Sequence, residues 1–599
     1  MPGPDRRMEA PALLSFAQQR LWFLDRLRPG RPDQNVPAAV RLRGRLDEAA
    51  LVSALTEVVR RHEVLRSRIV VVEDSPYQVT EPVGTFVPTV TDLTGLPPAQ
   101  ALERGRELVA ADMATPFDLG VAPMLRARLI RLTADDHLLL LVIHHIAADG
   151  WSLSVLWQEF SAVYRAAVTG RAATLAELPV QYADFAAWQH GSGTGAAPRD
   201  QLAYWREQLS GPSRPAFPAD RPRPALWSGR GDEIGIEIPP GTADRIRALG
   251  HAQGMTPFMT LLAAFQVLIA RSSGEPEVSV GTPISGRTRI EVEPLIGFFV
   301  NTLVLRTDLS GDPTFTEVLG RVRQVAVDAY AHQDVPFERL VEEVRPARDP
   351  GQHPLFTVMF QLDEPPALPA GLPGVGASAL PVPYPLVKFD IEVSLTDRGD
   401  HFTGVLRYAT DLFSHGTAHR LVQDFRSLLD HLAGSPGRPI SEWEPPLGPR
   451  VGRAGPGPST GTGTPSTETG APSAEAATPS TGTGTSYTGT SYTGTACTGA
   501  GRPSTETELL VTEVWTEVLG AAPAGVHSDF FASGGHSLPA SRLMSRLGRA
   551  LGLELPVALL FHHPTVAELA DRIDAALLGE LTGAPSAAVP AAAGEGRRS

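Results

Sequence analysis

The sequence predicts an α/β protein followed by a small all-α domain, and three features of the chain support this fold class. Residues 10–445 alternate helical and strand patterns, as α/β proteins do. Residues 449–503 consist almost entirely of Gly, Thr, Ser, Ala and Pro, a composition that cannot form a hydrophobic core. Residues 504–578 then carry helical patterns only. Because 599 residues exceed the usual size of one core, we expect at least three globular units.

Four segments of the α/β region show its elements clearly. Residues 51–61 space their apolar side chains three and four apart, which predicts an amphipathic helix. Residues 125–129 alternate apolar and basic side chains, as a strand with one buried face does. Residues 138–143 form an apolar run of the length of a buried strand, and residues 256–270 are apolar almost all round, as in a buried helix.

A core of this size is expected to divide into two lobes. We place the first lobe at about residues 10–190 and the second at about residues 215–445. The Pro-rich and Arg-rich residues 211–224 are the candidate crossover between them, because such segments interrupt regular structure.

The C-terminal region predicts a flexible connection to a helical bundle. As a coil of roughly 55 residues, segment 449–503 would have an end-to-end distance of about 40 Å, which lets the next domain move between sites. We expect helices at residues 505–519, after Ser537, and at residues 566–577, where Thr565 is a capping residue. Residues 579–599 are expected to be a disordered tail.

Composition and charge exclude several classes of function. A net charge of −14 disfavours a nucleic-acid partner, which requires clustered Lys and Arg. The chain has a single cysteine, Cys497, which lies in the low-complexity segment. Because a disulfide needs two cysteines, an intramolecular disulfide is excluded, and a reducing cytoplasm is favoured. We find neither a signal peptide nor an apolar stretch of the ~18 residues that a membrane span needs.

Two adjacent histidines, His144 and His145, end the apolar run and are followed by Asp149 and Gly150. Side chains alternate across a strand, so one imidazole is expected to face substrate and the other to pack inward. A histidine can accept a proton from an attacking nucleophile or hold that nucleophile by a hydrogen bond. The pair His562–His563 lacks the following Asp-Gly and is interpreted as structural. Metal binding is disfavoured, because the spacing differs from HExxH and no further ligand set is evident.

Ser537 lies in the second candidate site, Gly534-Gly535-His536-Ser537-Leu538. Two glycines let the backbone turn and leave the serine at a helix N-terminus, where the partial positive charge suits a phosphodiester. The alternative is a serine that only caps a helix.

Residues 13–440 resemble the condensation domains of nonribosomal peptide synthetases, and the similar segments follow the order of that family. The segment 144–150 resembles its HHxxxDG signature. The other similar segments are SFAQQRLW at 15–22, RHEVLR at 61–66, YADF at 182–185 with Trp188-Gln189, IGFFVNT at 296–302 and HQDVPFE at 332–338.

This resemblance implies two chloramphenicol-acetyltransferase-like lobes that form a V, with the active site in a tunnel between them. It assigns His145 to the cavity as the catalytic histidine and His144 to its support. Asp149 would organise the loop, and Gly150 would allow a thioester arm to approach the backbone. Arg287, in GTPISGR at 281–287, resembles the arginine that pairs with the aspartate as a structural brace, and a surface arginine is the alternative.

The segments DFF at 529–531, GGHSL at 534–538 and FHHPTVAEL at 561–569 resemble a peptidyl carrier domain. The resemblance implies 4'-phosphopantetheine attached covalently to Ser537. Together the two resemblances imply an acyltransferase that forms an amide between a donor thioester and an acceptor amine, the acceptor being held on Ser537. An ester-forming or free-acceptor acyltransferase and a non-catalytic carrier-docking module are the alternatives.

The implied partners are other members of a peptide assembly line. They are an upstream donor carrier protein, a stand-alone adenylation enzyme acting in trans and a phosphopantetheinyl transferase. Heterocyclisation is disfavoured because both histidines are present, and epimerisation because the carrier follows the catalytic domain.

Overall fold

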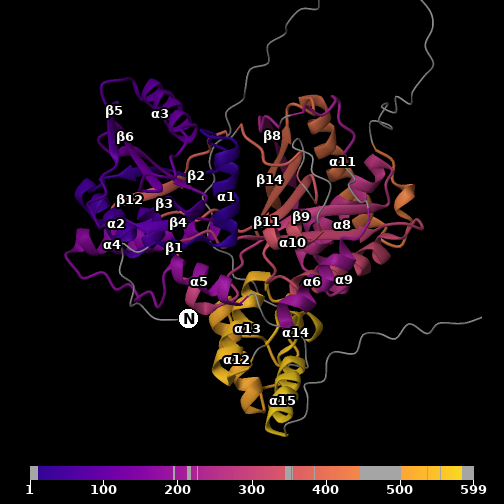
Figure 1. Ribbon diagram of the computed structural model, residues 1–599. Coiled ribbons are helices and arrows are strands. Elements are labelled where there is room, and N and C mark those ends of the chain that lie inside the picture. Colours follow the sequence, from indigo (N-terminus) through magenta and orange to yellow (C-terminus); the bar gives the residue numbers. More distant parts are fainter. Residues whose placement is uncertain are drawn as a thin grey trace, which may run out of the picture.

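The structure is a computed structural model that describes residues 11–192, 196–211, 217–225, 227–344, 353, 355–383, 385–445, 501–535, 537–553 and 555–582. Two α/β lobes lie side by side, and a helical bundle lies at their base (Figure 1). The predicted fold class is confirmed. The predicted linker at 449–503 lies outside the described residues except for its last three residues, and so does most of the predicted tail.

The N-terminal lobe is built on a five-stranded sheet in the order β12-β2-β7-β6-β5. On β7, Leu139 and Leu141 pack in the cluster that contains the apolar sides of α2 and α4, whereas Leu138 and Leu140 pack with α3. This burial on both faces explains the uninterrupted apolar run at 138–143. The elements are β2 (Asn35–Gly44), α2 (Glu48–Arg61), β5 (Thr89–Asp92), α3 (Pro98–Met113), β6 (Leu125–Thr133), β7 (Asp136–His144), α4 (Gly150–Thr169) and β12 (Val375–Ala379).

A second, three-stranded sheet in the order β1-β4-β3 lies in the same lobe, with α1 and α5 nearby. Helix α1 begins at a capping box in which Ser15 and Gln18 bond each other's backbone N–H. The hydroxyl of Ser15 also lies 2.8 Å from the hydroxyl of Tyr182, which joins α1 to α5. The elements are β1 (Ala12–Leu13), α1 (Phe16–Leu27), η1 (Glu63–Arg66), β3 (Ser67–Val72), β4 (Ser75–Thr80) and α5 (Tyr182–Ser192).

The C-terminal lobe is built on a six-stranded sheet in the order β10-β9-β11-β13-β14-β8. Its helix α8 is buried along nearly its whole length, as predicted from residues 256–270. The elements are α6 (Ala196–Gln208), β8 (Gly231–Ile238), α7 (Pro240–Ala252), α8 (Pro257–Ser273), β9 (Glu277–Ile284), η2 (Ile290–Val292), β10 (Asn301–Asp308), α9 (Phe315–Ala331), α10 (Phe337–Val344), β11 (Val358–Asp363), β13 (Ile391–Asp397), β14 (Phe402–Ala409), α11 (His415–Gly434) and η3 (Ile440–Glu442).

No single helix in the described ranges combines the length and apolar composition of a membrane span. Helices α7 and α8 meet these criteria only when taken together, and they are bent by 105° relative to each other.

The chain crosses between the lobes earlier than the sequence predicts. Helix α6 already packs in the C-terminal lobe, where Trp205 is buried and its indole N–H donates to the carbonyl oxygen of His332 at 2.8 Å. Residues 217–224 of the expected crossover lie on that lobe instead: Phe217 is part of its core and Arg223 forms an ion pair with Asp390. The contacts of these residues are with residues distant in sequence, as in the ion pair of Arg223 with Asp390, and the local composition does not predict them.

Strand β12 returns from the second half of the chain to the sheet of the N-terminal lobe. It pairs antiparallel with β2, with Val375 opposite Gly44 and Ala379 opposite Val40. The lobes are therefore joined by β12, a strand from the second half of the chain that completes the N-terminal sheet, as well as by the crossover before α6.

The C-terminal bundle contains α12 (Glu506–Leu519), α13 (Ser537–Leu551), α14 (Val557–His562) and α15 (Val566–Thr582). The three predicted helices are present, and α14 is an additional short one. Thr505 caps α12 through a capping box with Glu508. Helix α15 continues to Thr582, past the boundary expected at 578, because its helical pattern extends into residues assigned to the tail.

Candidate active site

The two histidines lie where β7 ends and the chain turns toward α4. The backbone N–H of His144 donates to Met124 (3.1 Å), and that of His145 donates to Gln34 (2.7 Å). Both backbones are therefore fixed, and the side chains diverge as the alternation of a strand predicts.

His144 is buried inside the N-terminal lobe. Its Nδ1 accepts the backbone N–H of Ile146 at 3.1 Å, and its ring meets that of Phe117 edge-on, with the centroids 5.8 Å apart. Burial lowers the pKa of His144 to about 3, and the charges of Lys388 and Arg126 act in the same direction. His144 is therefore neutral and shapes the strand end from inside the lobe.

His145 is partly exposed, and its ring lies 4.6 Å from that of Phe298, centroid to centroid. Its Nδ1 lies 2.8 Å from the carbonyl oxygen of Ala148. Because a carbonyl only accepts hydrogen bonds, Nδ1 carries the proton and Nε2 keeps its lone pair. The pKa of His145 is lowered well below its usual value, first by burial and then by the charge of Lys388. The imidazole is therefore neutral, with Nε2 as its acceptor atom.

Asp149 is fully buried and caps α4. One of its oxygens accepts the backbone N–H of Ser152 at 2.8 Å, and the other accepts that of Phe299 at 3.0 Å. The guanidinium of Arg287 lies 3.1 Å from Asp149 Oδ1, and both side chains are wholly buried. The structure therefore contains the expected ion pair, and the surface alternative for Arg287 does not apply.

Arg287 comes from the C-terminal lobe, so this ion pair joins the two lobes beneath the histidine loop. Its second guanidinium nitrogen donates to the carbonyl oxygens of Val292 (2.6 Å) and Leu295 (2.8 Å). The ring of Phe299 lies 4.0 Å from the guanidinium carbon. These contacts match the role of a brace.

Ser152 belongs to the same network but was not predicted from the sequence. Its hydroxyl lies 2.7 Å from Asp149 Oδ1, and it accepts the backbone N–H of Gly297 (3.0 Å) and one N–H of Arg287 (3.1 Å). The spacing of Asp149 and Ser152 is that of a capping box, a signal that could have identified this residue.

Gly150 is the first residue of α4. It is exposed, and a Cβ at this position would meet no atom within 4 Å. The surrounding space can therefore admit a ligand next to the backbone, but the fold itself does not require glycine here.

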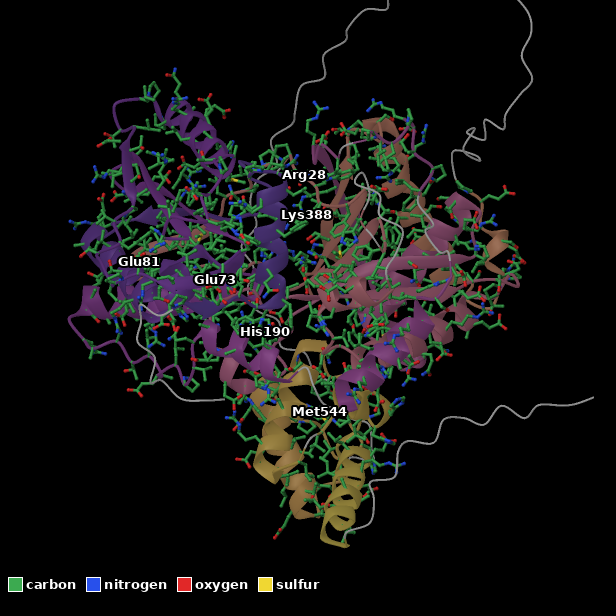
Figure 2. All side chains as sticks on the ribbon, viewed as in Figure 1. Arg28, Glu73, Glu81, His190, Lys388 and Met544 are labelled. Atoms are coloured by element: carbon green, nitrogen blue, oxygen red, sulfur yellow. The ribbon has the colours of Figure 1, made fainter. Side chains whose placement is uncertain are left out.

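Lys388 is a second residue that the sequence interpretation missed. It lies just before β13, its side chain is exposed, and Figure 2 places it between α1 and the sheet of the C-terminal lobe. The backbone N–H groups of Lys388 and Phe389 donate to Glu392. Its charge acts on both histidines although Lys388 lies more than 240 residues further along the chain.

Ser537 opens α13, as predicted. The first N–H groups of this 15-residue helix have no partners within the helix, which favours a phosphodiester at its start. Gly534 has a φ of 94°, and a Cβ on Gly535 would lie 2.3 Å from the ring of Phe530. The two glycines therefore allow the tight approach to the helix, and this local structure fits the attachment of phosphopantetheine.

The carrier bundle contacts both lobes at their base (Figure 1). The guanidinium carbon of Arg542 on α13 lies 4.2 Å from the centroid of the Trp151 ring. Phe561 on α14 stacks on Tyr330 of α9, with the centroids 5.3 Å apart. The helix that begins at Ser537 thus contacts the residue that follows Gly150.

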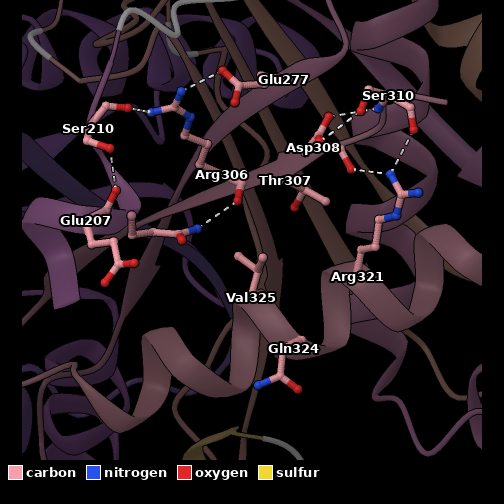
Figure 3. A pocket seen from close by; sticks show the side chains of 11 residues that line it. Glu207, Ser210, Glu277, Arg306, Thr307, Asp308, Ser310, Arg321, Gln324 and Val325 are labelled. Carbon is pink, nitrogen blue, oxygen red and sulfur yellow. Dashed lines mark hydrogen bonds and ion pairs between the residues drawn. The ribbon is translucent and has the colours of Figure 1, made fainter. Parts of the chain in front are cut away.

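A pocket of about 540 Å³ lies elsewhere, between α6, β10 and α9, and has no residue in common with the histidine site (Figure 3). Its two arginines are already engaged. Arg306 pairs with Glu277 (2.6 Å), and Arg321 donates to the carbonyl oxygen of Asp308 (2.8 Å). Both arginines of this pocket therefore already have protein partners.

Family models match both parts of the chain. The condensation domain model matches residues 8–446, and the phosphopantetheine attachment site model matches residues 510–573. A linear gramicidin synthase of Brevibacillus parabrevis is 41% identical over 435 residues, which are 72% of this chain and 8% of that protein. Phosphinothricin tripeptide synthetase PhsC of Streptomyces viridochromogenes is 40% identical over 453 residues, which are 73% of this chain and 41% of that protein.

The chain spans less than half the length of these two relatives. Among solved structures, the X-domain from teicoplanin biosynthesis, in complex with OxyB, is 32% identical with a TM-score of 0.63. That match covers 74% of this chain and 98% of the X-domain complex chain. The chain belongs to the condensation domain family of nonribosomal peptide synthetases, a family of amide-forming acyltransferases, and it also carries a helical carrier domain whose cofactor is 4'-phosphopantetheine.

Proposed function

We propose that this chain forms an amide bond between an acyl or peptidyl thioester on a donor carrier and an acceptor amine held on its own Ser537. The observation that carries this proposal is the contact between α13 and Trp151. It joins the helix that begins at the attachment serine to the first turn of α4, directly after the HHxxxDG segment. An acceptor amine that is held on Ser537 has to reach that segment, so a carrier docked at this place supports the proposal.

In this proposal His145 is the catalytic residue. Its Nε2 can accept a hydrogen bond or a proton from the attacking amine, because Nδ1–H is engaged with Ala148. The C–N bond forms at the thioester carbonyl carbon, the C–S bond breaks, and the leaving sulfur takes a proton to become a thiol. Tethering both substrates also removes much of the entropic cost of their encounter.

The remaining site residues position the histidine loop. Asp149 and Arg287 hold the end of the loop between the lobes, and His144 supports it from inside. Gly150 leaves open space next to the backbone. Ser537 would hold the phosphopantetheine, which supplies a thiol that carries the acceptor as a thioester.

We further propose three partners for the chain. An upstream carrier delivers the donor, a phosphopantetheinyl transferase modifies Ser537, and a stand-alone adenylation enzyme acting in trans loads the acceptor. A cytoplasmic location is part of this proposal and is supported by the presence of one cysteine in the whole chain.

A non-catalytic docking module is the second candidate function. The observation that favours it is the 32% identity to the teicoplanin X-domain, which was solved in complex with OxyB. An ester-forming or free-acceptor acyltransferase differs from the main proposal only in the nucleophile. The identity of the bond in the product separates these alternatives.

The test has two stages and uses the full chain. Incubation with coenzyme A and a broad-specificity phosphopantetheinyl transferase should add one phosphopantetheine by intact mass spectrometry. Ser537→Ala should abolish this gain, whereas Ser533→Ala, at an exposed serine four residues earlier, should not.

The second stage follows amide formation between a loaded donor carrier and the loaded chain. His145→Ala should slow it by about 10²–10⁴-fold, the usual contribution of a general acid or base. His251→Ala, at an exposed histidine at the end of α7, is the matched control. Unchanged product formation by His145→Ala would refute catalysis by His145, and no product from the unaltered, fully loaded chain would favour the docking module.

A further inference from the structure

Helix α13 of the carrier domain has an arginine face made of Arg542, Arg546 and Arg549. These positions are four and three residues apart, so their side chains lie on one side of the helix. Arg546 forms an ion pair within the carrier, with Glu517 at 2.9 Å. Arg542 and Arg549 instead contact the condensation domain, which makes this face the charged part of the contact surface.

The condensation domain meets the arginine face with an acidic edge made of Glu291 and Glu293, at η2 and just after it. Arg549 forms an ion pair with Glu291, and Arg542 Nε lies 3.8 Å from Glu293 Oε2. The side chain of Glu293 is only 14% exposed. Burial raises the pKa of Glu293, while the charges of Arg542, Arg546 and Arg287 oppose that increase. A carboxylate covered in this way needs countercharge, and the docked carrier supplies part of it.

Trp151 connects this charged contact to the candidate active site. Its indole N–H donates to the carbonyl oxygen of Glu293 at 2.9 Å. The guanidinium carbons of Arg542 and Arg287 lie 4.2 Å and 6.0 Å from the centroid of its ring. Trp151 therefore contacts the carrier through Arg542 and lies next to the arginine that holds Asp149.

A second contact, on the C-terminal lobe, fixes the orientation of the carrier. Phe561 of α14 stacks on Tyr330 with an interplanar angle of 16°, and the guanidinium of Arg323 donates to the carbonyl oxygen of Phe561 at 3.0 Å. The carrier therefore contacts the condensation domain at two separate places, through α13 and through α14.

We infer that the acidic edge, together with Trp151, is a selective docking surface for a carrier domain that bears arginines at the positions of Arg542 and Arg549, here the carrier of this same chain. The inference rests on the proposed function only in treating the docked carrier as the acceptor. Charge complementarity of this kind excludes partners with acidic residues at the same positions, because like charges would face each other across the contact.

The experiment measures docking and amide formation separately in the full chain. We expect Arg542→Glu/Arg549→Glu to increase hydrogen–deuterium exchange of residues 288–296 and to slow single-turnover amide formation from the tethered acceptor by at least about tenfold. Amide formation from a soluble aminoacyl thioester, which needs no docking, should be unchanged. In the single variant Arg549→Glu, adding Glu291→Arg should restore most of the lost exchange protection and rate.

Arg572→Glu, at an exposed arginine on α15, is the matched control for the charge reversal. Unaltered exchange and rate in the Arg542→Glu/Arg549→Glu variant would overturn the docking inference. If the unaltered chain forms no amide with either the tethered or the soluble acceptor, the proposed function fails. The exchange measurement would still test the docking surface in that case.

Discussion

At the scale of single residues, the buried ion pair of Asp149 and Arg287 is the feature of the site most sensitive to substitution. Neither side chain is exposed, and their hydrogen bonds come from both lobes. A buried charge that loses its partner is costly, because the remaining charge has neither water nor countercharge. The pair therefore matters for the integrity of the whole loop that carries His145.

Arg287→Ala is expected to destabilise the condensation domain by about 3–5 kcal/mol, since it leaves Asp149 buried without its cation. Urea unfolding and the yield of soluble protein measure this effect. Arg407→Ala removes a partly exposed arginine that pairs with Glu233 at 3.1 Å, and it should cost less than about 1 kcal/mol. Wild-type solubility, stability and activity in Arg287→Ala would contradict the role of a brace.

Because the charge of Lys388 lowers the pKa of His145, we expect a change at Lys388 to alter the pH dependence of activity. The lysine charge is the second cause, after burial, of the lowered pKa of His145, and His144 adds a smaller effect. Removing the charge in Lys388→Met raises the pKa of His145 toward its usual value. If the neutral imidazole is the active form, the loss of activity on acidification should then begin at a higher pH.

The measurement is the pH profile of amide formation from a soluble aminoacyl thioester, which avoids any effect on carrier docking. Lys388→Arg keeps a positive charge and is the matched control, so its acidic limb should remain close to that of the unaltered chain. An identical acidic limb in Lys388→Met would show that the lysine does not control the protonation of His145.

At the scale of elements, β12 is the least expected part of the fold. It belongs by sequence to the second half of the chain, yet it forms an edge of the N-terminal sheet. Gly44, at the end of β2, faces it with a φ of 123°, and a Cβ there would lie 2.0 Å from the carbonyl oxygen of Gly374. Only glycine allows this approach of the two backbones.

Gly44→Ala should therefore destabilise the condensation domain by about 1–3 kcal/mol, the usual cost of a strained backbone position. Chemical denaturation measures the change. Gly235→Ala in β8 is the control, because a Cβ there would meet no atom within 4 Å and should leave the free energy of unfolding nearly unchanged. Equal stability of the two variants would show that the approach of β12 to β2 is not tight.

At the scale of the whole molecule, three long-range connections hold the site together. They are the ion pair between Asp149 and Arg287, the exchanged strand β12, and the carrier contact through Trp151. Each connection joins parts that are distant in sequence. The histidine loop therefore depends on both lobes, while the docked carrier brings the start of α13 to the same region.

The sequence by itself determined the fold class, the helical carrier domain and the candidate site residues, because the signals for these are local. Strand length, apolar spacing, capping residues and the two motifs each lie within about twenty neighbouring residues. It did not predict Ser152 and Lys388 as site residues, the return of β12, the crossover before α6 or the docking surface of the carrier. Most of these features depend on contacts between residues more than a hundred positions apart. Ser152 is the exception, because its capping box with Asp149 is a local pattern. Only the tertiary structure decides them, because the burial and charge of a side chain depend on neighbours that local sequence patterns do not specify.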